Sequence, residues 1–189
     1  MAINFPFDTR KAVEVICWLA NEQPRIDLYT IVKAIYFADK EHLHRYGRPV
    51  IGDRYYAMEH GMVPSITYDI LKGSGGKHGD DLRTVLDGVV ERRMEEYPRF
   101  YPQRSPNEEF LSGTDVQCLR AGLEKCSGLN FDELKDLAHQ DRAYRIAWDN
   151  KPPSIEAVPM DYESIIDDDV EERDELLDYL RETAPYLVM

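Results

Sequence analysis

Asp39 and His42 are the residues whose types and spacing come closest to an acid–base pair. They lie three residues apart in the run KAIYFADKEHLHRY, so on a helix their side chains occupy neighbouring positions. The apolar stripe of this helix includes Leu28, Ile31 and Ile35, and it reaches both residues near its centre when extended at about 100° per residue. Burial there would perturb the protonation of both groups, as it does in many active sites.

Two interpretations of this pair follow from the sequence. An enzyme site near Asp39, His42 and His60 would need a nucleophile or a substrate pocket, and the chain has no GxSxG motif and no catalytic-cysteine signature. The interpretation that we favour is a buried polar network that orients the segment after the helix, because buried polar groups must find partners. The nearest candidate partners are Arg48, Arg54 and Tyr55.

The other residues with chemical potential do not form a recognisable site. The five histidines are spread along the chain without an HExxH motif or a Cys/His cluster, so we expect no metal. The glycine-rich run KGSGGKHGDD lacks the first glycine and the Ser or Thr of a phosphate-binding loop and follows a helix, so we interpret it as a surface loop. The three cysteines have no CxxC spacing and fit free thiols in a reducing compartment. We therefore predict no cofactor.

The net charge of −13 is concentrated near the end of the sequence. Residues 152–189 contain twelve Asp or Glu against two Arg, and so carry −10 of the total. Such a chain is repelled by phosphate backbones, which argues against nucleic acid as the main ligand. The acidic segment favours solubility first and a basic protein partner second. No apolar run approaches the roughly 20 residues of a membrane helix, and the first residues do not resemble a signal peptide, so we expect a cytoplasmic protein.

Helical periodicity and end signals predict the elements that position these residues. Helices are expected from Asp8 or Thr9 to Pro24, from Asp27 to Tyr46, and over SITYDILK, DVQCLRAGLEKC, FDELKDLAH, RAYRIAWDN and DYESIIDDDVEERDELLDYLRETA. The run VIGDRYYAMEH alternates as a hairpin does, and GVVERRMEEYPRFYP is typical of an edge strand that continues into a loop. The sequence thus predicts a mainly helical α+β single domain with a small antiparallel sheet or hairpin inserted between helices.

The hairpin segment, which we define as residues 47–64, links the second helix to the third. Gly47, Gly52 and Gly61 stand where the chain must turn sharply, while Pro49 and Pro64 fix its exit and the next entry. We interpret the segment as a rigid scaffold tied to the preceding helix by hydrogen bonds. Its exposed side chains are candidates for binding a protein partner, since tyrosine provides large contact area at low entropic cost. These candidates are Tyr55, Tyr56, Met58, His60 and Met62.

The run from Lys33 to Lys72 resembles the Panacea domain, the SocA-like antitoxin family also described as phage-associated proteins. That family combines a K-hydrophobic-hydrophobic-YFAD helix with GRP, GD-x-Y-x-A, a GPVPS-like turn and a Y-D helix, and Met62 here replaces the proline usual in the turn. The later run LNFDELKDLAHQDRAYRIAW also resembles the family, notably at His139 and Trp148. The matching positions of the first run are Lys33, Tyr36, Phe37, Ala38, Asp39, His42, Gly47, Arg48, Pro49, Gly52, Asp53, Tyr55, Ala57, Gly61, Val63, Pro64, Ser65, Tyr68 and Asp69.

The resemblance implies a protein-binding role without catalysis. Panacea domains neutralise unrelated toxins encoded beside them, and one relative presents its toxin to a cytoplasmic protease. By analogy, the chain is expected to bind a cognate toxin, with such a protease as a second partner. The resemblance implies a Panacea-like domain over residues 1–170, with residues 171–189 as an acidic helical extension of the same domain. The alternatives are a proteolytic adaptor or phage-associated interaction protein without a toxin partner, and the enzyme described above.

Overall fold

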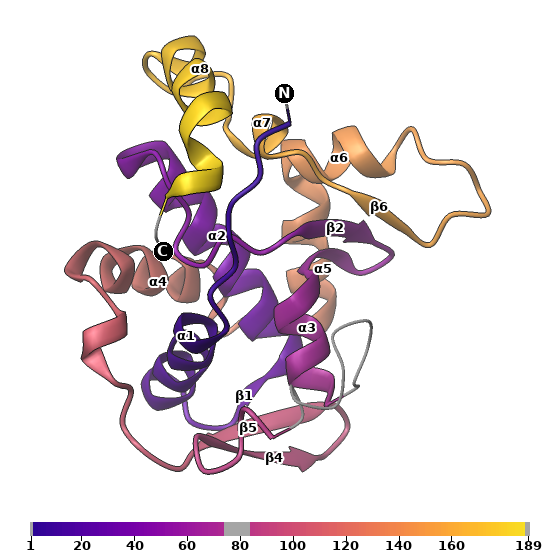
Figure 1. Ribbon diagram of the computed structural model, residues 1–189. Helices are drawn as coiled ribbons and strands as arrows, with labels where there is room; N and C mark the ends of the chain where they lie inside the picture. Colours follow the sequence, from indigo (N-terminus) through magenta and orange to yellow (C-terminus); the bar gives the residue numbers. More distant parts are fainter. Residues whose placement is uncertain (1, 74–83, 188–189) are drawn as a thin grey trace.

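The structure is a computed structural model and describes residues 2–73 and 84–187. In this part of the chain eight α-helices accompany two small antiparallel sheets, which confirms the predicted mainly helical α+β class (Figure 1). The glycine-rich run lies largely outside the described residues. The helices are α1 (Thr9–Glu22), α2 (Leu28–Tyr46), α3 (Ser65–Lys72), α4 (Gly113–Cys126), α5 (Phe131–Gln140), α6 (Arg142–Trp148), α7 (Tyr162–Ile165) and α8 (Arg173–Thr183).

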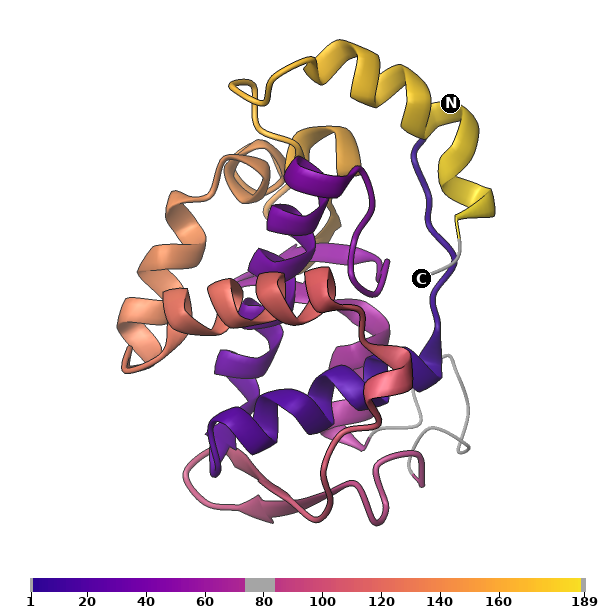
Figure 2. The same ribbon diagram turned by 90° about the vertical axis from the view of Figure 1, so that its left-hand side faces the viewer.

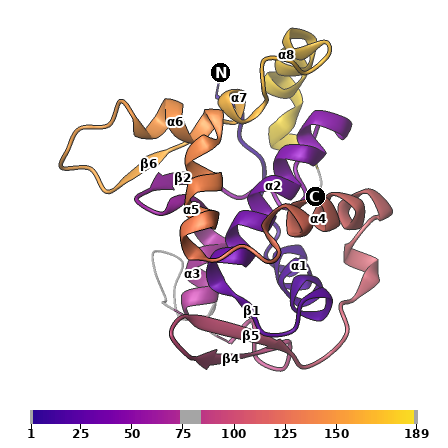
Figure 3. The ribbon, with the colours of Figure 1, turned by 180° about the vertical axis from the view of Figure 1, so that it is seen from behind.

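Helix α2 runs through the centre of the molecule, and the other elements pack around it (Figures 1 and 3). Its ends follow the predicted signals: the Asp27 side chain accepts from the N–H of Thr30 at 2.9 Å, and Gly47 is a left-handed C-cap with φ of 66°. Helix α4 crosses α2 closely, as Figure 2 shows. At the crossing, a Cβ on Gly122 would lie 2.3 Å from the carbonyl oxygen of Ala34, so a residue without a side chain is required there.

Two three-stranded sheets replace the single small sheet that the sequence predicts. The first has the order β3 (Gly61–Pro64), β2 (Tyr55–Met58), β6 (Ala157–Pro159), and its β2–β3 hairpin agrees with the prediction. The second has the order β1 (Ile26–Asp27), β5 (Pro98–Pro102), β4 (Val90–Met94). The expected edge strand is therefore wrong: β4 and β5 form a hairpin and β5 lies in the middle of its sheet. The prolines of β5 stand at its two ends, where they interrupt the ladder least.

The C-terminal segment contains two helices, and the single helix predicted over it is wrong. Helix α7 ends at Ile165, and Glu172 adopts a left-handed φ of 53° before α8 begins. The intervening residues are mostly acidic, and the guanidinium of Arg173 donates to the carbonyls of Ile166 and Glu163. These bonds hold the chain in a turn at this point. Helix α8 then buries Leu180 against the body of the molecule, near the C-terminal end of α2 (Figure 2).

Candidate functional site

Asp39 lies on α2 and is fully buried. Its Oδ1 accepts hydrogen bonds from the backbone N–H groups of Val50 at 2.9 Å and Ile51 at 3.1 Å. Its Oδ2 accepts a hydrogen bond from the Tyr55 hydroxyl at 2.9 Å. Burial raises the pKa of Asp39 to about 6, although the bonds from Tyr55 and the two N–H groups oppose that rise. The carboxyl group thus fixes the chain that leaves α2 and connects it to strand β2.

Asp53 does the same for helix α3, which begins after Pro64 without a cap from that residue. Its Oδ1 accepts from the N–H of Ile66 at 3.0 Å, and its Oδ2 accepts from the N–H and hydroxyl of Thr67 at 2.8 and 2.7 Å. The cap of α3 therefore comes from an earlier segment. Burial raises the pKa of Asp53. The backbone carbonyl of Asp53 also accepts from the Tyr162 hydroxyl at 2.7 Å, which joins α7 to this segment.

His42 is fully buried and points toward α4 rather than toward Asp39. Its Nδ1 lies 2.8 Å from the carbonyl oxygen of Arg48, and its Nε2 lies 3.1 Å from the Thr114 hydroxyl and 3.3 Å from Asp115 Oδ1. Burial acts to raise the pKa of Asp115, but hydrogen bonds from His42 and the Lys11 ammonium outweigh it and hold the pKa well below its usual range. This cluster binds α1, α2 and α4 together.

The structure changes the partners that the sequence indicates for this network. Tyr55 bonds to Asp39 and Arg48 contacts Asp115, but the Arg54 side chain is exposed and only its backbone N–H takes part. Within the described residues no hydrogen bond joins Asp39 to His42. Sequence reasoning missed Asp115, whose only signal is its place in the capping box that begins at Ser112.

The tip of the β2–β3 hairpin is held by α5 and α6. His139 Nε2 lies 3.1 Å from the carbonyl oxygen of Glu59, and the Tyr144 hydroxyl donates to the carbonyl of Met58 at 3.0 Å. The His139 and Tyr144 rings are stacked with centroids 4.7 Å apart. Trp148 continues this stack at 5.9 Å from Tyr144 and is only half-buried. Trp148 therefore belongs to the wall of the hairpin region rather than to the central core.

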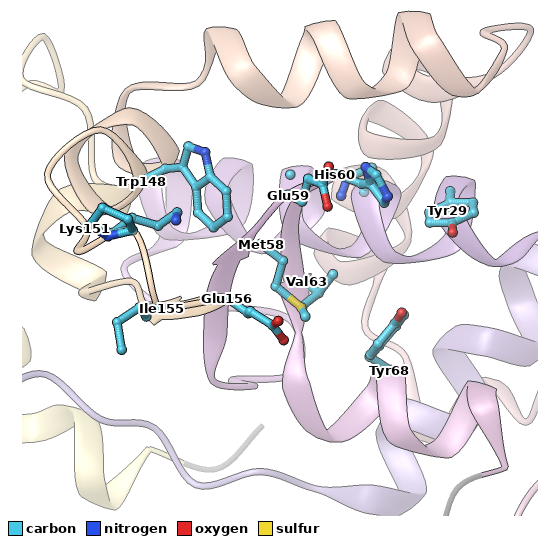
Figure 4. Close-up of a pocket in the computed structure, with 13 residues that line it drawn as sticks. Tyr29, Met58, Glu59, His60, Val63, Tyr68, Trp148, Lys151, Ile155 and Glu156 are labelled. Carbon is cyan, nitrogen blue, oxygen red and sulfur yellow. The ribbon is translucent and has the colours of Figure 1, made fainter.

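A cavity of about 550 Å³ opens beside the hairpin, between α2, α3 and the segment from Trp148 to Glu156. Figure 4 shows Trp148 and Tyr29 at opposite ends of the lining, with Met58 and His60 between them. Tyr68 also lines it, whereas Asp39 and His42 do not. Lys33 lines the cavity too, although the sequence indicated only that it matches a position of the family motif. Its position within the buried run 31–38 of α2, where no other residue is charged, is the signal that marks it.

The proposed partner-binding set needs a correction, because two of its members are buried. Tyr55 is 1 % exposed and Met62 is 0 % exposed, so neither side chain is available to a partner in this structure. In β2 the side chains alternate, with Tyr55 turned to the core and Tyr56 and Met58 partly exposed. His60 is exposed at the hairpin tip. Tyr56, Met58 and His60 remain as candidates.

Two general features bear on the class of site. Among the described residues, no group of three or more His, Cys, Asp or Glu side chains is arranged to hold a metal ion. Across residues 2–73 and 84–187, no helix combines the length and the apolar character that a bilayer-spanning helix requires.

Comparison with known proteins identifies the family. A family model of the antitoxin SocA-like Panacea domain matches residues 31–145, which is more than half of the chain. The chain belongs to this family. The match begins in α2 and ends in α6, so it contains Asp39, Asp53, Asp115 and the whole hairpin. Comparisons with curated proteins and with solved structures found no match. Family membership supports an antitoxin-type role, for which a protein toxin is the natural partner and catalysis is not needed.

Proposed function

We propose that this protein is an antitoxin that neutralises a cognate protein toxin by binding it directly. The observation that carries the proposal is the family match over residues 31–145. The site geometry supports a non-catalytic role, because the carboxylates of Asp39 and Asp53 accept hydrogen bonds from backbone N–H groups of their own chain. His42 is likewise engaged by groups of the fold. These residues hold the hairpin segment in place, and the toxin binds to the outer surface of that segment.

The toxin-binding surface that we favour comprises the hairpin side chains Tyr56, Met58 and His60 with the neighbouring Trp148 and Ile155. These residues surround the cavity or lie beside it, and they present aromatic and apolar groups at least partly to solvent. Partly exposed aromatic and methionine side chains are enriched at the centres of protein interfaces. The stack of Trp148 on Tyr144 and the bonds at the hairpin tip hold the surface in place before binding, which lowers the entropic cost of association.

The acidic C-terminal segment supplies the charge that would select a basic toxin. Its charged side chains are exposed on and before α8, whereas Leu177 and Leu180 face inward. Charge complementarity of this kind speeds association and selects partners more than it adds affinity. The exposed acidic residues after α7 are Asp168, Asp169, Glu171, Glu172, Asp174, Glu175, Asp178 and Glu182.

Co-expression in bacteria tests the proposal. Each open reading frame adjacent to the gene is expressed alone and then with this protein, and growth is followed. We expect one neighbour to be toxic alone and harmless in the presence of this chain, with the two proteins purifying as a complex. Absence of any toxic neighbour, or rescue without complex formation, would contradict direct neutralisation.

Matched variants test the surface. Met58→Asp places a charge on the proposed interface and should abolish rescue, whereas Met94→Asp changes a methionine that is 67 % exposed on β4 and should leave rescue intact. Equal rescue by the two variants would move the interface away from the hairpin. A second pair, Asp174→Lys and Glu175→Lys, reverses charge on α8. If these variants retain the complex but lose degradation of the toxin by a cytoplasmic protease, neutralisation proceeds through proteolysis of the toxin and not through simple blocking.

A further inference from the structure

The cavity beside the hairpin has the properties of a small-molecule site. Its volume of about 550 Å³ falls within the ~300–1,000 Å³ that ligand pockets occupy. Met58, Val63 and Trp148 give it an apolar and aromatic wall, and the Tyr29 ring lies at the opposite end (Figure 4). Tyr29 is held by an edge contact to Phe131, with centroids 4.8 Å apart. The walls are therefore preformed and suit a flat or apolar body.

Lys33 places a buried amino group against this cavity. The side chain is 1 % exposed, and its Nζ donates to the carbonyl oxygen of Met62 at 2.7 Å. An ammonium group has three N–H donors, and that carbonyl takes one of them. Among residues 2–73 and 84–187 no carboxylate lies within ion-pair distance of this Nζ, although most buried charges in proteins are paired. The ammonium form of Lys33 therefore has no counter-ion among these residues, and an anionic ligand would supply one.

The approach to Lys33 depends on Gly61, which also lines the cavity. A Cβ at Gly61 would lie 2.9 Å from Lys33 Nζ and 2.4 Å from the Ala138 Cβ. Gly61 has a φ of 101°, a conformation that residues with a side chain rarely adopt. The glycine therefore lets the hairpin backbone come close to the amino group of Lys33 where both residues line the cavity.

The charged side chains in the cavity lining limit the kind of anion that could bind. Glu59 and Glu156 both line the cavity and are drawn in Figure 4, while Lys151 lies over the Trp148 ring at 4.4 Å from its centroid. Two carboxylates in the lining disfavour a multiply charged anion such as a phosphate monoester, because like charges repel. A ligand with a single carboxylate on an apolar body can pair with the ammonium group of Lys33 and is repelled least by Glu59 and Glu156.

We propose that this cavity binds a small-molecule monocarboxylate with an aromatic or apolar body, and that Lys33 receives the carboxylate. The body lies against Trp148, Met58 and Val63. This is a ligand-binding activity in addition to toxin binding, and it does not depend on the toxin.

Phenylacetate is the probe, and phenylacetamide, its uncharged counterpart of similar shape, is the control. Binding to the full chain is measured by NMR titration at pH 6. We expect phenylacetate to bind and phenylacetamide to bind about tenfold more weakly or worse, because only the carboxylate can form a charge-assisted hydrogen bond with Lys33. Lys33→Met should lower phenylacetate affinity by about tenfold or more, and Lys151→Met, which removes the other lysine of the cavity, by less than about threefold.

A pH series on the unaltered protein covers the case in which Lys33→Met does not fold. Burial lowers the pKa of Lys33 to about 7, so the ammonium form is lost as the pH rises through neutrality and phenylacetate affinity should fall between pH 6 and 8.5. Imidazole also titrates in this range, so His60→Gln is the control and should keep the same dependence. The titratable or charged groups that face Lys33 or line its cavity are Cys126 on α4, Tyr29, Glu59, His60, Tyr68, Lys151 and Glu156.

Several results would overturn the proposal. One is that phenylacetate and phenylacetamide bind with equal affinity. Another is that the NMR signals of cavity residues do not shift at about 10 mM phenylacetate. A third is that Lys151→Met lowers phenylacetate affinity more than Lys33→Met does. A peptide that ends in phenylalanine presents the same carboxylate on a polypeptide. If this peptide binds more tightly than phenylacetate, the site serves a protein terminus and the small-molecule proposal fails. None of these outcomes depends on rescue from a toxin.

Discussion

Replacement of Asp39 by asparagine tests the buried carboxyl group on which the hairpin segment depends. Burial raises the pKa of Asp39 from 3.8 to about 6 in the folded protein. The folded state therefore binds this proton more tightly than the unfolded chain does. The resulting stability is fully present below about pH 4 and is lost as the pH rises through about 6. At about 1.4 kcal/mol for each tenfold change in proton affinity, the loss amounts to about 3 kcal/mol by pH 7.

Asparagine keeps the hydrogen bonds and removes the titration. Its Oδ1 can accept from the N–H groups of Val50 and Ile51, and its amide N–H can donate to the Tyr55 hydroxyl oxygen. Urea unfolding of the parent and of Asp39→Asn is measured at pH 4, 5, 6 and 7. The free energy of unfolding of the variant, relative to the parent, should rise by about 2.5 kcal/mol across this range, because part of the effect is already present at pH 4.

Two further variants separate charge from geometry. Asp136→Asn removes a carboxylate on the exposed face of α5, and its difference from the parent should stay within about 0.5 kcal/mol at every pH. Asp39→Ala leaves Val50, Ile51 and Tyr55 without their acceptor and should be about 1–3 kcal/mol less stable than Asp39→Asn. A difference between Asp39→Asn and the parent that does not change from pH 4 to 7 would refute the reasoning.

Other predictions concern packing and ion pairing. Gly122→Ala should lower the free energy of unfolding by about 1–3 kcal/mol despite the better helix propensity of alanine, because its methyl group meets the backbone of α2. Gly113→Ala is the control: no atom lies within 4 Å of the added Cβ, so this variant should be as stable as the parent when unfolded by urea. If the two variants were equally stable, close contact between α2 and α4 would be contradicted. Trp148→Ala should lower the stability measured by thermal unfolding by about 1–2 kcal/mol, because the side chain is only half-buried. Loss of a fully buried ring costs ~3–5 kcal/mol, and a loss of that size would mean that Trp148 belongs to the core. Asp115→Asn should cost about 2–4 kcal/mol at pH 7. Because the folded pKa of Asp115 is lowered, the stability it provides is lost as the pH falls below about 4, so this cost should shrink toward pH 3 and an unchanged cost there would contradict the ion pairing.

Helices α2 and α5 were predictable because the signals at their ends are local. Asp27 and Gly47 mark the ends of α2, and Asn130 with Glu133 forms the capping box of α5, all within one turn of the helix that they delimit. The family resemblance was equally visible, since it rests on a continuous run of motif residues. The buried position of Asp39 followed from the helical period of its neighbours.

Contacts between segments far apart in the sequence depend on the path of the chain through the fold, and no local sequence pattern specifies that path. Strand β6 has three residues and gains its strand conformation by pairing with β2, about 100 residues earlier in the chain. The sequence predicted that the side chains of β2 alternate between two faces, but packing against α2 decided which face is buried. As a result, the Tyr55 side chain lies in the core. The cavity at Lys33 joins residues of α2, the hairpin and the segment after α6, so its existence was decided by tertiary packing alone.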